Sequence, residues 1–195
     1  MGPLVCTTIA ALLFFPTAAF AHVGIGSTAS FTAGVAHPLG GLDHITVMIA
    51  VGLWAALKSG RALWAWPCAF VGVMIAGAAA LGMAHVSVPF VESGILASVV
   101  ILGLLVALAV DAPVWLGAII IGALAIFHGH AHGSEVPETA SGLEYIAGFT
   151  LATTGLHFVG IGTGVALSRA QWTMLVRAAG ATCALIGVGL IADLF

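Results

Sequence analysis

Charged side chains are scarce in this sequence. Asp, Glu, Lys and Arg make up only 6% of its 195 residues, whereas 62% of the residues are hydrophobic. A soluble domain typically has about a quarter of its residues charged, so this much apolar surface needs lipid as its solvent. The net charge of −3 also gives no basic surface for nucleic acid. The composition therefore predicts a protein that is embedded in a lipid bilayer and binds no nucleic acid.

Cysteine pairs and nucleotide-binding motifs are also lacking. The three cysteines form no CxxC pair, and Cys68 and Cys183 lie inside apolar runs, so a disulfide framework is not expected. No Walker motif is present, which excludes direct use of ATP by this chain. Histidine stands out against this background, because its 8 residues are twice the 4 Lys and Arg. Imidazole chemistry is therefore the first indication of function.

The apolar residues form a leader and a series of longer runs. Residues 1–21 are typical of a signal peptide with cleavage before His22, since small residues occupy positions 19 and 21, although the missing basic residues leave an uncleaved extra helix open. The later runs are each near the ~20 residues that cross about 30 Å of hydrocarbon. They lie at approximately 36–57, 62–84, 90–110, 114–132, 143–167 and 172–194. We therefore expect an all-α, polytopic membrane bundle of about six transmembrane helices, forming one domain over residues 22–195.

The few basic residues predict how this bundle is oriented. With six spans, Lys58, Arg61, Arg169 and Arg177 all fall on one side of the membrane. The positive-inside rule makes that side cytoplasmic. We therefore expect a bacterial inner-membrane protein whose mature N-terminus and C-terminus are both periplasmic. The sequence leaves assembly into a homo-oligomer open.

The first expected span begins with a group of potential metal ligands. On a straight helix His37 and His44 would differ by about 20° around the axis, with Met48 on the same stripe and Asp43 about 100° to one side. Unwinding at Gly40-Gly41 is the alternative, and it would turn Asp43 and backbone carbonyls inward. Ionisable groups inside a membrane are costly and usually functional. Imidazole with carboxylate suits nickel, cobalt and zinc, so we predict a metal site here rather than a simple helix start.

A second group closes the fourth expected span, in the segment FHGHAHGSE of residues 127–135. On a helix His128, His132 and Glu135 would share one face. In an extended chain His128, His130 and His132 would project to one side instead. Either conformation supplies donors for one metal ion, so we predict metal binding and leave the conformation open.

Two further histidines are candidates of lower priority. His157 lies midway along the fifth expected span, where Thr153, one turn earlier, could hydrogen-bond its ring; a core histidine with no metal role is the rival interpretation. His22 would offer its α-amine and imidazole as one chelate if the leader is cleaved before it. Glu144, near the start of the same span, is equally compatible with an entrance carboxylate and an interface residue.

These motifs resemble a known family. The first is similar to the signature of the HupE/UreJ proteins, which are hydrogenase and urease accessory proteins proposed to be nickel permeases, in the pattern His37-Pro38-x-x-Gly41-x-Asp43-His44-x-x-x-Met48-x-x-Val51-Gly52-x-Trp54. The second resembles the family's HGxAHGxE segment. The resemblance covers almost the whole chain and implies nickel as the ion. It also implies that the transport residues are His37, Asp43, His44, His128, His132 and Glu135.

The sequence thus favours a secondary permease that imports Ni²⁺, or Co²⁺, to supply metalloenzymes such as hydrogenase or urease. No enzyme activity and no permanently bound cofactor are expected, because the ion is cargo. Two rivals stay open. An intramembrane zinc hydrolase would hold zinc on three histidines and use Asp43 or Glu135 to activate water. A bis-histidine haem protein would show a Soret band after purification.

Overall fold

The computed structural model describes residues 31–82, 84, 86–136 and 141–194. The leader and His22 lie outside these residues. Every regular element in the described part of the chain is helical, which confirms the all-α prediction there. The elements are α2 (Phe31–Gly40), α3 (Leu42–Lys58), α4 (Ala62–Gly77), a π-helical turn η1 (Ala78–Gly82), α5 (Val91–Ala107), α6 (Val114–Glu135), α7 (Ser141–Arg169) and α8 (Thr173–Ile191).

Several of these helices are long and apolar enough to cross a membrane. Four stretches qualify individually, namely Ala62–Gly82, Val114–Ser134, Gly142–Arg169 and Thr173–Ile191. The pair α2 and α3 qualifies as a fifth if it is one bent span, and α5 is apolar but shorter, with 17 residues. All six predicted apolar runs are therefore helical, and four or five of them have the dimensions of a span.

The first expected span is not a straight helix. It consists of α2 and α3, which meet at Gly41 at an angle of 85°. The straight-helix prediction is therefore wrong, and the alternative of a break at the Gly40-Gly41 pair is confirmed. The sequence permits the break because two glycines are poor helix formers. At the break Gly41 adopts an extended conformation, with φ −106° and ψ 123°.

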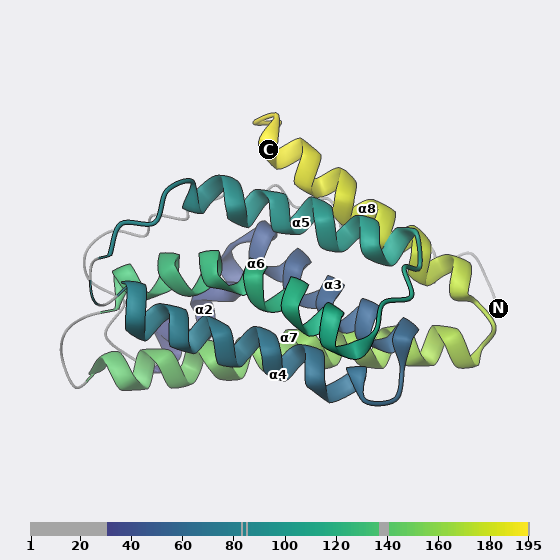
Figure 1. Cartoon of the computed structure of the whole chain (residues 1–195), viewed down its shortest axis with the longest axis horizontal. Helices are drawn as coiled ribbons and strands as arrows, with labels where there is room; N and C mark the ends of the chain where they lie inside the picture. Colours follow the sequence, from purple (N-terminus) through teal and green to yellow (C-terminus); the bar gives the residue numbers. More distant parts are fainter. Residues whose placement is uncertain (1–30, 83, 85, 137–140, 195) are drawn as a thin grey trace.

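The helices pack mainly as pairs: α3 on α7, α4 on α6, and α5 on α8, while α2 covers the first part of α7 (Figure 1). Glycines bring the paired backbones close together. A Cβ atom on Gly52 would strike the carbonyl oxygen of His157, and one on Gly160 would strike that of Ile49. Close contact through small residues is how helices associate in lipid, where lipid tails are as apolar as the helices.

The two ends of this bundle differ in chemistry. At one end, which we name the lysine end, the rings of Trp54 and Trp66 contact each other at a tilt of 34°, with centroids 4.2 Å apart, and Trp54 Nε1 donates to the Val110 carbonyl at 2.8 Å. Lys58 and Asp111 form an ion pair of 2.5 Å at the same end. The opposite end, which we name the histidine end, contains the junction of α2 with α3 and the last turns of α6. The predicted metal ligands are concentrated there.

Candidate metal site

Three histidines from two helices converge at the histidine end. His44 comes from the first turn of α3, and His128 and His132 come from the last turns of α6. One ring nitrogen of each lies within 4.8 Å of one from each of the others, and all three side chains are buried. The closest pair is His44 Nε2 and His132 Nε2, 2.6 Å apart. We name these three residues the histidine cluster.

The helical conformation of α6 creates half of this cluster. Because α6 continues to Glu135, His128 and His132 stand one turn apart on the same face. The extended alternative for this segment is therefore wrong. The same helical geometry turns His130 away, and its Nε2 donates to the carbonyl of Val86, 2.7 Å away. His130 is consequently not brought into the cluster.

Two polar neighbours determine which ring nitrogens of His44 and His128 carry the lone pair. Asp43 Oδ1 accepts hydrogen bonds from both the backbone N–H and Nδ1–H of His44, each at 2.8 Å, which leaves the lone pair of His44 on Nε2. Ser98 donates its hydroxyl to the Ile95 carbonyl at 2.6 Å, so its oxygen accepts from His128 Nε2 at 3.0 Å. The lone pair of His128 is then on Nδ1, which has no partner among the described residues. Such outer hydrogen bonds orient the rings of metal-bound histidines.

His37 lies beside the cluster. Its ring centroid is 4.7 Å from that of His132 and 6.2 Å from that of His44, so the 85° break still keeps both histidines of the first motif together. Tyr145 and Phe149 of α7 cover this group, with the Phe149 ring 4.2 Å from His132 and the Tyr145 ring 5.9 Å from His37. Asp43 and four histidines thus meet under an aromatic cover.

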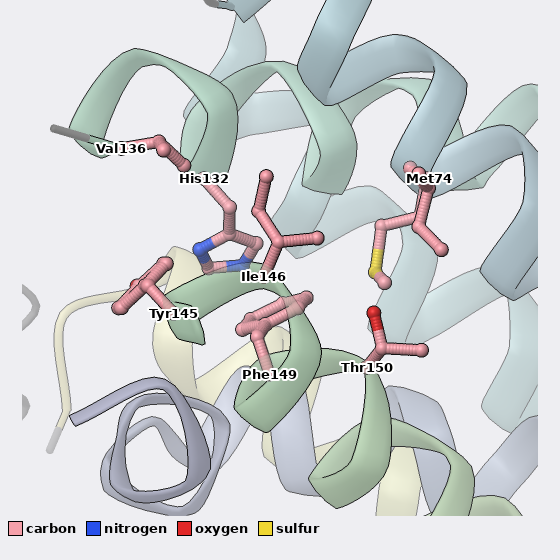
Figure 2. A pocket seen from close by; sticks show the side chains of 8 residues that line it. Met74, His132, Val136, Tyr145, Ile146, Phe149 and Thr150 are labelled. Carbon is pink, nitrogen blue, oxygen red and sulfur yellow. The ribbon is translucent and has the colours of Figure 1, made fainter. Parts of the chain in front are cut away.

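A small cavity of about 20 Å³, roughly the room for one water molecule, adjoins His132 between α4, α6 and α7 (Figure 2). Its other walls are mainly apolar and include Met74, Phe149 and Thr150. Figure 2 shows the sulfur of Met74 and the hydroxyl of Thr150 on the side of the cavity away from Tyr145. The cluster therefore borders a small, mainly apolar space against the first turns of α7.

The remaining predicted residues lie elsewhere. Met48 is fully buried in the hydrophobic core one turn beyond His44. His157 is also fully buried and is not part of the histidine cluster, but the ring of Phe70 contacts both it and His128, with centroid distances of 5.3 and 5.4 Å. The predicted hydrogen bond between Thr153 and His157 is wrong, because neither side chain has a hydrogen-bond partner among the described residues. Glu135 ends α6, and its side chain is not among those described; Glu144 is exposed.

The family relationship can now be stated. The HupE / UreJ protein family matches residues 10–190. The chain belongs to the HupE/UreJ family. It is 44% identical over 185 residues to Protein HupE of Rhizobium leguminosarum bv. viciae, a match that covers 95% of this chain and 96% of that protein. No solved structure matches the chain. Family membership and the long apolar helices together indicate a membrane protein.

The donors of this HupE/UreJ protein fit a borderline divalent ion. Three imidazoles with a nearby carboxylate and no thiolate are a donor set for nickel, cobalt or zinc. With metal–nitrogen bonds of about 2.0–2.1 Å, two donors at right angles lie about 3 Å apart. The 2.6 Å between His44 Nε2 and His132 Nε2 is only slightly shorter. A small rotation of either ring would therefore accommodate an ion between them.

Three residues of the HupE/UreJ site were not predicted from the sequence. Ser98 could have been noticed as an isolated hydroxyl within the apolar stretch of α5. Phe70 and Phe149 carried no signal, because aromatic residues are ordinary in apolar helices. Their contacts with histidines arise only when α4 and α7 pack against α6 and α3.

Proposed function

We propose that this HupE/UreJ protein is a secondary permease that carries Ni²⁺, or Co²⁺, into the cell to supply metalloenzymes such as hydrogenase or urease. The observation that carries the proposal is the buried histidine cluster, in which three ring nitrogens lie within 4.8 Å of one another. Buried imidazoles that converge inside a membrane protein are costly unless they bind something. The relative named HupE supports the assignment.

We further propose the arrangement in the membrane. The bent pair α2–α3 and the short helix α5 join the four long helices to make six spans. The lysine end then faces the cytoplasm, because Lys58, Arg61, Arg169 and Arg177 all belong to that side. The histidine end and both mature termini face the periplasm. In this orientation the ion meets the histidine cluster first.

The driving force and the role of each residue follow from this arrangement. A doubly charged ion moving inward gains about 4–5 kcal/mol per 100 mV of membrane potential. At the periplasmic end, His37 and Asp43 attract the ion and replace part of its water shell. His44, His128 and His132 then bind it. Proton competition for the imidazoles would assist release, since histidine ligands must be deprotonated to bind.

The test is uptake of labelled nickel by cells that express the protein. Replacing His37, Asp43 or His44 with alanine should lower the expression-corrected initial rate of nickel uptake at least about tenfold. His130→Ala is a matched control from the second motif, because His130 binds the Val86 carbonyl and not the cluster. It should keep at least about half of the wild-type rate. Undiminished uptake in the first three variants would refute the assignment.

A zinc hydrolase is the second candidate, because three convergent histidines also form catalytic zinc sites. One observation argues against it. Asp43, the nearest described carboxylate, accepts two hydrogen bonds from His44 and is therefore an orienting group rather than a base for water. The two functions differ in metal occupancy: catalytic zinc stays bound through purification, whereas transported Ni²⁺ exchanges readily. Retention of one zinc per chain after dialysis would favour the hydrolase.

A further inference from the structure

His157 has an unusual environment for a buried histidine. Its side chain is 0% exposed, yet neither Nδ1 nor Nε2 has a hydrogen-bond partner in the described part of the chain. Most buried polar side-chain atoms in proteins are hydrogen-bonded, and leaving them unpaired is costly. If His157 served only to fill space, an apolar residue of similar size would be better. Its two unpaired nitrogens therefore indicate a partner that is present only part of the time.

The threonines on the same helix support this interpretation. Other threonines satisfy their own hydroxyls: the buried Thr46 donates to the Leu42 carbonyl at 2.5 Å, and the exposed Thr182 donates to that of Ala178 at 3.1 Å. This bond to the carbonyl four residues earlier is the usual arrangement within helices. Thr150 and Thr153 do not make it, and both hydroxyl oxygens are buried without a partner among the described residues.

These polar groups continue inward from the histidine cluster. Phe149 of α7 contacts the ring of His132 at 4.2 Å, and Thr150, which follows it, lines the cavity beside His132 (Figure 2). Thr153 lies one turn beyond Phe149, and His157 lies two turns beyond it, about 12 Å along the helix axis at 1.5 Å per residue. Phe70 of α4 touches both His128 and His157, at 5.4 and 5.3 Å between centroids. A polar track on α7 thus runs from the cluster past the ring of Phe70.

We propose that His157, together with the hydroxyls of Thr150 and Thr153, forms a second binding station for the divalent ion, reached from the histidine cluster by passing Phe70. The proposal rests on the proposed transport function and extends it. The cluster selects and holds the ion at the histidine end. The second station replaces part of the lost coordination halfway through the bundle, where the ion would otherwise meet only apolar side chains.

The test compares two substitutions at one position in labelled-Ni²⁺ uptake. His157→Leu removes the donor, whereas His157→Gln retains a polar donor of similar reach. The second station predicts that Leu lowers the maximal rate about tenfold or more while Gln stays within about threefold of wild type. The apparent KM should change less than about twofold, because binding at the cluster is intact. A space-filling role predicts the opposite order, with Leu equal to or better than Gln, and that result would overturn the proposal.

A second pair of variants guards against misfolding at position 157. Thr153→Val should lower the maximal rate, whereas Thr182→Val, which removes a hydroxyl that binds only its own helix, should not. Equal rates for these two variants would also count against the second station. The wild type and His132→Ala are measured alongside. If the wild type shows no uptake above background, the proposed function itself fails; if it transports and only the His157 and Thr153 variants behave as wild type, the second station alone is refuted.

Discussion

A single methyl group added at the break between α2 and α3 should weaken Ni²⁺ binding at the metal site without unfolding the protein. The perturbation is Gly41→Ala. Gly41 has φ −106° and ψ 123°, values that alanine adopts without strain. The new Cβ atom, however, would lie 2.6 Å from Asp43 Oδ1 and 3.0 Å from His44 Nδ1. The methyl group therefore meets the contact that orients His44, while the backbone is unaffected.

The size of the effect follows from these distances. Carbon and oxygen atoms need well over 3 Å, so the Asp43 carboxylate, 2.6 Å from the new Cβ atom, must move by about 0.7 Å to clear the methyl group. That movement stretches its 2.8 Å hydrogen bonds to His44 beyond a useful length. Hydrogen bonds to charged groups contribute about 1.5–3 kcal/mol, and outer partners of metal ligands contribute about 10–100-fold in affinity or activity. We expect Gly41→Ala to weaken Ni²⁺ binding and uptake by that factor.

The neighbouring glycine provides the control. A Cβ atom on Gly40 would have no heavy atom within 4 Å, so Gly40→Ala should transport at nearly the wild-type rate. Both variants are compared by initial uptake of labelled Ni²⁺, corrected for the amount of protein in the membrane. The effects of Gly41→Ala and Asp43→Ala should be less than additive, because the carboxylate is the closer of the two groups that the methyl group meets. Equal uptake by the two single glycine variants would refute the role of the Asp43–His44 contact.

Three other predictions concern the surroundings of the cluster. Ser98→Ala should weaken Ni²⁺ binding by the purified protein about tenfold, because the ring of His128 loses the hydrogen bond that orients it. An unchanged Ni²⁺ affinity in titration calorimetry would contradict this. Gly52→Ala should lower thermal stability in detergent, because its Cβ would strike the backbone of α7, whereas Gly162→Ala, with nothing within 4 Å, should not. Acidification should weaken Ni²⁺ binding, because protons compete for the imidazoles; tighter binding in acid would count against histidine ligation.

The helices and one part of the site could be predicted from the sequence because they depend on local patterns. Apolar runs of about 20 residues give helices wherever lipid is the solvent. The spacing of His128 and His132 placed them on one face as soon as α6 was helical. The break at Gly41 was only one of two alternatives, because a Gly-Gly pair permits both a straight and a broken helix. Packing against α7, which the sequence does not reveal, selects between them.

The rest of the site depends on contacts between helices that are distant in the sequence. Ser98 meets His128 only because α5 packs beside α6, and Phe70 contacts both His128 and His157 only because α4 packs against both α6 and α7. The expected bond between Thr153 and His157 failed for a local reason. A spacing of four residues brings two side chains near each other on a helix, but it does not determine where their polar atoms point.

The break between α2 and α3 also bears on how the proposed site would stabilise a dication. Helix C-termini carry partial negative charge, and two of them, those of α2 and α6, end close to His37 and His132. The N-terminus of α3 carries the opposite charge and would repel an ion, but Asp43 lies in its first turn and accepts the backbone N–H of His44. A straight helix through residues 31–58 would keep the carbonyls at the end of α2 in internal hydrogen bonds. The break at Gly41 therefore provides negative helix charge for the ion, while Asp43 offsets the positive charge that the same break exposes.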